Sequence, residues 1–355
     1  MSRAVITLPL SPLKNHEFSR LVSPIIGETL SKELGANFYL ALNLLDSFKD
    51  RSDNLDSYLD NINKHKINCD LWVDIDHIEL LLEKVSLLIK KNFIYEKKVM
   101  MYRCDCGVIE VDKNNIKTCN PNNTLYSFNN DQMVCLKCGS VCKLYEEDEL
   151  VFDFSKVNNF YVKFMPDYLN KDIKSFNKVI LPSYTIISRK RDTGIYINYN
   201  NHKYNIDIDF LWEVYVSLFD DDEKVILCGN KELYQLYMVS VLEYVLNSHI
   251  NSIYVGTPII EGINDCNFSV NNIDDVITKK LIVILNTKWS VKQRKIDYDL
   301  VSKLRRMPLD KKFDIYETIC YNNCVGNFNK DLAYIFNEQF NFQKVMKKVK
   351  ERRNV

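Results

Sequence analysis

No segment of the sequence is long and apolar enough to cross a bilayer. The longest apolar stretches, such as residues 280–285 (KLIVIL), are far shorter than the about 20 residues that a membrane-spanning helix needs. The N-terminal residues also lack the apolar core of a secretion signal, and Pro9 and Pro12 interrupt them. We therefore expect a soluble, cytoplasmic protein that has no membrane partner.

An excess of charge of one sign is absent as well. The 355 residues contain 47 Lys and Arg and 47 Asp and Glu, so no overall basic field attracts nucleic acid. Glycine and proline are scarce, at nine and eight residues, which excludes a collagen-like or low-complexity chain. With 46% hydrophobic residues, the composition is that of a globular protein. We expect no DNA partner, and any contact with RNA has to be local.

The sequence predicts a strand–helix–strand unit near its start. Residues 4–8 (AVITL) form a short apolar run typical of a buried strand, and 18–34 have the apolar spacing of a helix. Gly35 is expected to end this helix, and 37–45 (NFYLALNLL) to form the next strand. Residues 75–92 then predict an amphipathic helix.

A second unit of the same kind follows a segment of different composition. Strands are predicted at 224–228 and 252–255, with a helix at 233–246 between them. Near the C-terminus the run KKLIVIL at 279–285 predicts a strand, followed by helices that end in a cationic stretch. We divide the chain into a first α/β half (1–98), an insertion (99–155), a second α/β half (156–272) and a small, mostly helical C-terminal region (273–355).

Two pairs of cysteines in the insertion indicate a zinc site. Cys104 and Cys106 are followed by Gly107, and Cys135 and Cys138 by Gly139. Four thiolates on two tight turns match the ligand set of structural, tetrahedral zinc, and glycine lets the backbone turn around the metal. Such a site has no open position for catalysis. One ligand stays open, because two further cysteines are nearby: Cys119 and Cys142.

The other cysteines and most histidines have no spacing typical of a metal site or catalytic triad. We interpret them as structural or scattered residues: Cys69, Cys228, Cys266, Cys320, Cys324, His65, His77, His202 and His249.

The order of these parts resembles the catalytic domain of class I aminoacyl-tRNA synthetases. Residues 187–195 (ISRKRDTGI) are similar to the ISRQRxWGIP segment of the methionyl and isoleucyl branch, and 225–246 to the strand, turn and helix at the ribose side. The distance from the N-terminal loop to Cys104 is similar to that in glutamyl-tRNA synthetases, so the branch stays open. The resemblance implies a Rossmann-like parallel sheet split by a zinc-ribbon insertion.

The resemblance also implies where ATP, with Mg²⁺, and the amino acid bind. The loop that carries the HIGH motif in the family corresponds to residues 11–20, with one histidine and no glycine, and KMSKS to 265–271, without its lysines. The implied catalytic residues are His16 and Ser269. The implied nucleotide-binding residues are Ser11, Pro12, Lys14, Arg20, Gly229, Asn230 and Lys231.

Two positions are expected to contact the amino acid. Asp46 corresponds to a family carboxylate that meets the α-amino group, although it could also be a turn residue. Trp212 lies with Tyr215 in an aromatic run at 210–219 that could form the wall of the pocket or part of the core. Arg189 and Arg191 could contact a phosphate or pair with the acidic run at 220–222.

The resemblance therefore implies ATP-dependent activation of an amino acid. Transfer to tRNA and transfer to a small acceptor are both open, because no recognisable anticodon-binding domain follows residue 272. A catalytically silent relative with a binding or regulatory role is the alternative, because both phosphate-binding loops have lost cationic and hydrogen-bonding groups.

Overall fold

The structure is a computed structural model that describes most of the chain. The described residues are 2–11, 18–45, 47, 55–113, 125–129, 132–181, 183–190, 193–229, 232–247, 252–257, 259–261, 264–265, 268–269, 273, 275–287, 293–321 and 342–352.

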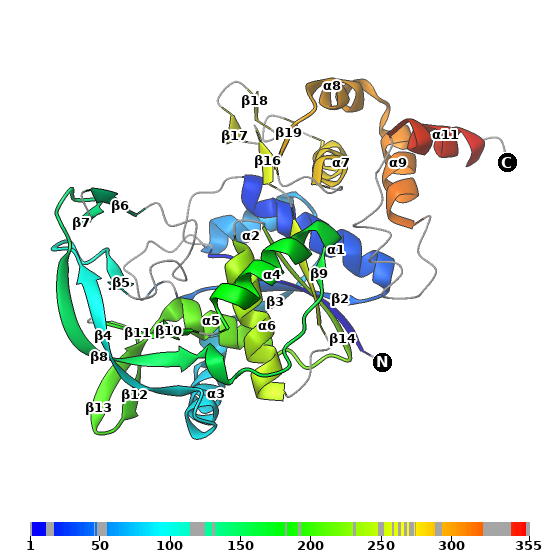
Figure 1. Ribbon diagram of the computed structural model, residues 1–355. Helices are drawn as coiled ribbons and strands as arrows, with labels where there is room; N and C mark the ends of the chain where they lie inside the picture. Colours follow the sequence, from blue (N-terminus) through cyan, green and yellow to red (C-terminus); the bar gives the residue numbers. More distant parts are fainter. Residues whose placement is uncertain are drawn as a thin grey trace.

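A six-stranded parallel sheet forms the centre of the molecule (Figure 1), with the order β3-β2-β1-β14-β15-β9. Its strands are β1 (Arg3–Thr7), β2 (Asn37–Leu42), β3 (Asp70–Val73), β9 (Phe164–Met165), β14 (Glu223–Gly229) and β15 (Ser252–Thr257). The middle residues of the central strands β1 and β14 are apolar and buried because helices cover both faces of the sheet.

Helices from different parts of the chain cover the two faces. One face packs against α1 (Val22–Leu34), α2 (Leu55–Lys64), α7 (Val276–Thr287), α8 (Tyr298–Arg306) and α9 (Leu309–Tyr321). The other packs against α3 (Ile78–Lys90), α5 (Ile208–Ser217) and α6 (Leu233–Asn247), with α4 (Asn170–Val179) beside them. Helix α11 (Phe342–Arg352) contributes Val345 and Val349 to the first core.

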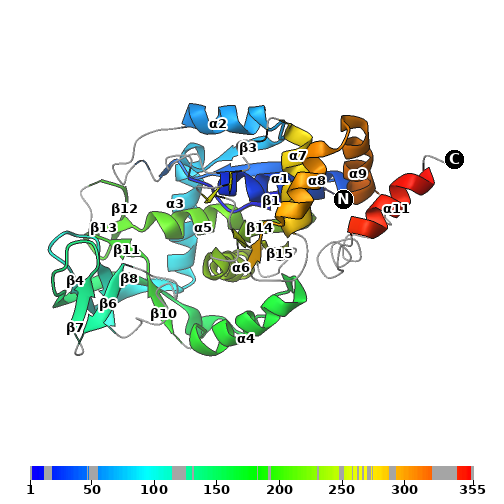
Figure 2. The ribbon, with the colours of Figure 1, turned by 90° about the horizontal axis from the view of Figure 1, so that it is seen from above.

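The insertion supplies most of an antiparallel sheet at the opposite end of the molecule from α8, α9 and α11 (Figures 1 and 2). Four strands make this sheet: β4 (Ile94–Arg103), β5 (Glu110–Asp112), β8 (Lys143–Asp153) and β10 (Tyr184–Ile186). A hairpin of β6 (Tyr126–Asn129) and β7 (Gln132–Cys135) lies between β5 and β8 in the chain.

Short elements complete the described structure. A three-stranded sheet contains β11 (Ser188–Arg189), β12 (Ile195–Tyr199) and β13 (His202–Ile206). Beyond β15 lie β16 (Ile259–Glu261), which pairs with β19 (Gln293–Lys295), and the hairpin of β17 (Asn264–Asp265) and β18 (Phe268–Ser269). The 3₁₀ segments are η1 (Phe18–Leu21), η3 (Asp74–His77), η5 (Phe154–Lys156) and η6 (Asp167–Leu169).

The predicted fold class is confirmed, and both strand–helix–strand units form close to their predicted positions. Gly35 ends α1 in the left-handed conformation, with φ of 58°. The prediction of a strand at KKLIVIL was wrong, because these residues belong to helix α7. A short apolar run fits a buried helix as well as a buried strand, and α7 is buried at every residue from Thr278 to Leu285.

No helix within the described ranges combines the length and the apolar character that crossing a membrane requires. The four predicted domain boundaries stay a prediction.

Candidate functional site

The sheet has a topological switch point between β1 and β14. After β1 the chain enters α1 on one face of the sheet, and after β14 it enters α6 on the other face. In open parallel sheets this divergence leaves a crevice at the carboxyl ends of the two strands, and ligands bind there. The nucleotide-binding residues implied by the sequence follow these two strands.

Backbone contacts hold the segment after β1. Leu10 N–H donates to Ala41 O at 2.9 Å, and Asn43 N–H donates to Leu10 O at 3.1 Å. Arg20 Nη1, on η1, donates to Ser11 O at 2.5 Å, so the two ends of the predicted phosphate-binding loop meet. The Ser11 hydroxyl is buried and has no hydrogen-bond partner among the described residues. Pro12, Lys14 and His16 lie outside those residues.

Gly229 is the last residue of β14 and pairs with Thr257 on β15. A Cβ atom added at Gly229 would meet no heavy atom within 4 Å, so the space beside this end of β14 is open to a ligand. Asn230 and Lys231 lie outside the described residues. Ser269 is in the β17–β18 hairpin, whose backbone pairs it with Asn264.

A buried carboxylate that the sequence analysis missed holds the segment after β2. Asp74 follows β3 and is 0% exposed, and its Oδ1 accepts hydrogen bonds from Leu44 N at 2.8 Å and Leu45 N at 3.2 Å. It fixes the backbone immediately before Asp46, which is itself outside the described residues. Only the parallel pairing of β2 with β3 brings these segments together.

Near the carboxyl end of β3, residues from β3 and from the region of α5 form a cluster of aromatic rings. Trp72 lies one residue before the end of β3, and its ring centroid is 4.4 Å from that of His77, 5.4 Å from Tyr215 and 4.6 Å from Phe219. Trp212 is 8% exposed and belongs to the core around α5. Sequence reasoning identified Tyr215 but not Trp72, because the two are far apart in the chain.

Two polar atoms of this aromatic cluster are buried without a partner among the described residues: Trp72 Nε1 and Tyr215 Oη. Unpartnered buried polar groups are rare in proteins, so they mark a place where a ligand or water would complete the hydrogen bonding. Burial, together with the nearby Asp74 and Asp76 carboxylates, raises the pKa of Tyr215, so its hydroxyl stays a hydrogen-bond donor.

Arg189 links the insertion to α5. Its Nε donates to Asp207 Oδ2 at 2.5 Å, and its Nη1 donates to Glu110 O at 2.9 Å. Asp207 is the N-cap residue of α5 and accepts from Asp209 N at 3.2 Å. A carboxylate at the strand–helix junction thus pairs with Arg189, and the two expected roles of Arg189, a phosphate contact or a pairing with the 220–222 run, stay predictions.

The four predicted cysteines meet at one place. One sulfur atom from each of Cys104, Cys106, Cys135 and Cys138 lies within 4.8 Å of the others. Cys104 Sγ accepts from Ile109 N at 3.2 Å. The turns are possible because Gly107 and Gly139 have φ of 70° and 71°, a region that side chains disfavour.

These four thiols fit a structural zinc ion, because four sulfur ligands about 2.3 Å from a tetrahedral ion lie at such mutual distances. The Ser140 hydroxyl contacts Cys138 Sγ at 2.9 Å and helps to lower the pKa of this thiol to about 6, which favours the thiolate that metal needs. Cys142 is not in the group, and burial raises the pKa of its thiol to about 11. Cys119 lies outside the described residues.

No protein-family model matches this sequence, and no curated protein matches it either. Solved structures do match. Methionyl-tRNA synthetase of Mycobacterium tuberculosis bound by methionyl-adenylate gives a TM-score of 0.64 at 10% identity, over 90% of this chain and 71% of that one. A second complex of that enzyme with methionyl-adenylate gives 0.62 at 12% identity, over 88% and 70%.

The apo form of the same enzyme gives a TM-score of 0.60 at 12% identity, over 85% of this chain and 65% of that one. The similarity thus extends over most of the chain and includes the split parallel sheet. The chain has the fold of a class I aminoacyl-tRNA synthetase catalytic domain.

Proposed function

We propose that this protein activates an amino acid with ATP to form an aminoacyl-adenylate. The observation that carries the proposal is the topological switch point between β1 and β14, with open space beside Gly229 and a buried, unpartnered Ser11 hydroxyl among the described residues. It is supported by the shared fold with a synthetase whose structures hold methionyl-adenylate.

In this reaction a carboxylate oxygen of the amino acid attacks the α-phosphorus of ATP. The bond from that phosphorus to the bridging oxygen breaks, and pyrophosphate leaves with the electron pair. Catalysis depends on donors and cations placed where negative charge develops. We assign this role to His16, Lys14 and the N-terminal end of η1 and α1, with Ser269 on the opposite hairpin.

The remaining residues position the substrates. The open backbone at Gly229, with Asn230 and Lys231, would contact the nucleotide, and Mg²⁺ would accompany the phosphates. Asp46 would pair with the α-amino group beside the aromatic cluster of Trp72, Tyr215 and Phe219. The zinc ion would hold the insertion together and take no part in the reaction.

The acceptor of the activated amino acid is tRNA or a small amine. The described helices α8 and α11 support an RNA acceptor, because Lys303, Arg305 and Arg306 end α8 and are exposed.

A catalytically silent binding protein is the second candidate. It is favoured by the missing lysines at 265–271 and by the single histidine at 11–20.

Pyrophosphate exchange into ATP tests the proposal. Each of the twenty standard amino acids is added in turn to metal-replete protein. We expect exchange with one amino acid or a few related ones, and a loss of at least about 100-fold in His16→Ala, the size expected for a general acid–base or charge-stabilising group. His202→Ala is the matched control, because His202 is exposed on the β12–β13 hairpin.

Absence of exchange with every amino acid, in protein that still binds ATP, would favour the silent binding protein. Exchange that persists unchanged in His16→Ala would contradict the assigned role of the 11–20 loop.

A further inference from the structure

A second pocket lies at the amino ends of the strands, on the opposite edge of the sheet from the crevice. Its volume is about 300 Å³, and it lies between the C-terminal part of α1 and the starts of β2 and β3. This size is at the small end of ligand pockets, about 300 to 1,000 Å³, and suits a metabolite of few atoms. Nothing in the proposed activation reaction uses it.

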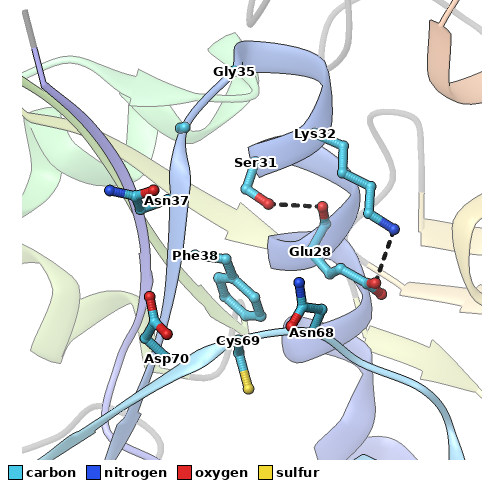
Figure 3. Close-up of a pocket in the computed structure, with 10 residues that line it drawn as sticks. Glu28, Ser31, Lys32, Gly35, Asn37, Phe38, Asn68, Cys69 and Asp70 are labelled. Atoms are coloured by element: carbon cyan, nitrogen blue, oxygen red, sulfur yellow. Dashed lines mark hydrogen bonds and ion pairs between the residues drawn. The ribbon is translucent and has the colours of Figure 1, made fainter.

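One wall of the pocket carries an ion pair (Figure 3). Glu28, on α1, has a side chain only 3% exposed, and its Oε1 is 2.9 Å from Lys32 Nζ, one turn further along the helix. Its Oε2 is 2.6 Å from Lys280 Nζ on α7. Lys280 also donates to Lys66 O at 3.0 Å, so this second pair is fixed. Lys32, at 37% exposed, is the ammonium group that can turn towards a ligand.

The opposite wall is less polar. The Phe38 ring is buried, and the Cys69 thiol packs against the same core as α1. Figure 3 shows Phe38 and Asn68 between the strands and α1, whereas Asn37 and Asp70 point away from that helix. The pocket therefore combines an apolar side with a carboxylate and an ammonium group that face each other.

Burial and nearby charges shift the pKa values of two side chains at or near the pocket. Burial is the main cause that raises the pKa of the Cys69 thiol to about 11, and the Glu28 and Asp70 carboxylates add to it. Burial also lowers the pKa of His65, which precedes the pocket in the chain, to about 4, with contributions from Lys279, Lys64 and Lys280. Cys69 therefore stays a neutral thiol.

We propose that this pocket binds a free α-amino acid as a zwitterion, away from the activation site. The ligand carboxylate pairs with Lys32, and the ligand ammonium group takes its place at Glu28 Oε1, so one ion pair is exchanged for two. Lys280 remains on Oε2 and keeps the buried carboxylate neutralised. The amide of Asn68 adds a hydrogen bond, and Phe38 and Cys69 contact the side chain of the ligand.

Equilibrium dialysis of the full chain without ATP tests this proposal, with each of the twenty amino acids as the probe. We expect one amino acid or a related group to bind at a Lys32-dependent site, counted separately from any binding at the activation site, which Asp46→Ala should remove. Lys32→Gln should weaken it at least about tenfold, the effect of losing one charge-assisted hydrogen bond. Lys64→Gln is the matched control, because Lys64 is an exposed lysine on the neighbouring α2 that does not line the pocket.

Two further arms separate this site from the crevice and from simple cation binding. Asp46→Ala, which removes the carboxylate assigned to the α-amino group at the activation site, should leave this binding unchanged. The bound amino acid should also slow alkylation of Cys69 by N-ethylmaleimide, as followed by peptide mass spectrometry. The matching amine without its carboxylate, and the matching acid without its amino group, should each bind at least about tenfold more weakly.

Three results would overturn the proposal. They are no binding at millimolar concentrations, binding that is lost in Asp46→Ala but kept in Lys32→Gln, and binding that leaves Cys69 unprotected. The outcome is independent of pyrophosphate exchange, so failure of the activation proposal and failure of this one are distinguishable.

Discussion

The surroundings of single side chains decide their chemistry in this protein. His65 is 2% exposed, its Nδ1 has no partner among the described residues, and its ring lies 5.3 Å from that of Phe18. Because a charged imidazole would be buried close to three lysines, the pKa of His65 falls to about 4. His202, with a side chain 62% exposed, lies beside Glu96 instead.

This difference predicts a pH effect on stability. Between its ordinary pKa of 6.5 and about 4, the His65 side chain of the unfolded chain binds a proton that the folded protein excludes. The free energy of unfolding should therefore fall by up to about 1.4 kcal/mol for each pH unit lost across this window. Urea unfolding at pH 7, 6 and 5 should show a smaller fall in His65→Gln than in the wild type. An unchanged slope in His65→Gln, or the same change in His202→Gln, would contradict the assignment.

The cysteine cluster makes a second prediction at the residue scale. Metal-replete wild type should contain about one zinc ion per chain by mass spectrometry of metals, and Cys104→Ser and Cys138→Ser should contain almost none. Both variants should also lower the melting temperature, because metal-binding free energy is folding free energy. Cys142→Ser is the control and should keep its zinc. If Cys142→Ser alone lost its zinc, Cys142 would be a zinc ligand in place of one of the four predicted cysteines.

Buried ion pairs join helices and strands that are distant in the chain. Lys280 on α7 reaches Glu28 on α1, and Lys224 on β14 lies 2.9 Å from Glu243 on α6. In both pairs the side chains are less than 10% exposed. Such pairs contribute little net stability but are costly to break, since the remaining charge is left buried.

The packing of α7 on α1 therefore depends on Lys280, a lysine within the apolar run of α7. Lys280→Met should lower the free energy of unfolding by about 3 kcal/mol, near the lower end for a broken buried pair, because Lys32 still contacts Glu28. The double variant Glu28→Met with Lys280→Met should recover most of this loss. Denaturant unfolding measures both, and a double variant no more stable than Lys280→Met would contradict the pairing.

Charge is separated along the whole molecule although the chain is neutral. Residues 273–355 contain 18 Lys and Arg and 10 Asp and Glu, a net charge of +8, so the rest of the chain carries −8. Much of this positive charge lies on α8 and α11, away from the insertion (Figure 2). A basic surface of this kind attracts polyanions in a salt-dependent way.

We expect bulk tRNA to bind through this surface. Replacing Lys303, Arg305 and Arg306 together by Gln should weaken binding and reduce the slope of log affinity against log salt by up to about 3. The matched control replaces Lys171, Lys174 and Lys178, three exposed lysines of α4, by Gln. Filter binding at several salt concentrations measures the slopes, and equal losses in the two variants would contradict a specific basic surface.

Local sequence determined the parts of this fold that depend on short segments. Both strand–helix–strand units, the end of α1 at Gly35 and the four clustered cysteines follow from apolar spacing and from turns of a few residues. The same local information failed at KKLIVIL, since a fully buried helix has no polar face to reveal its period.

Tertiary structure alone decided which distant side chains meet. The stacking of Trp72 on Tyr215, the pairing of Arg189 with Asp207 and Glu110, and the Glu28–Lys280 pair join different elements. No periodicity encodes such contacts, because they depend on the order of strands in the sheet and on the face each helix covers. The sequence by itself thus determined the local elements and the four-cysteine cluster, and the packing of the sheet decided the switch point, the aromatic cluster and the pocket beside α1.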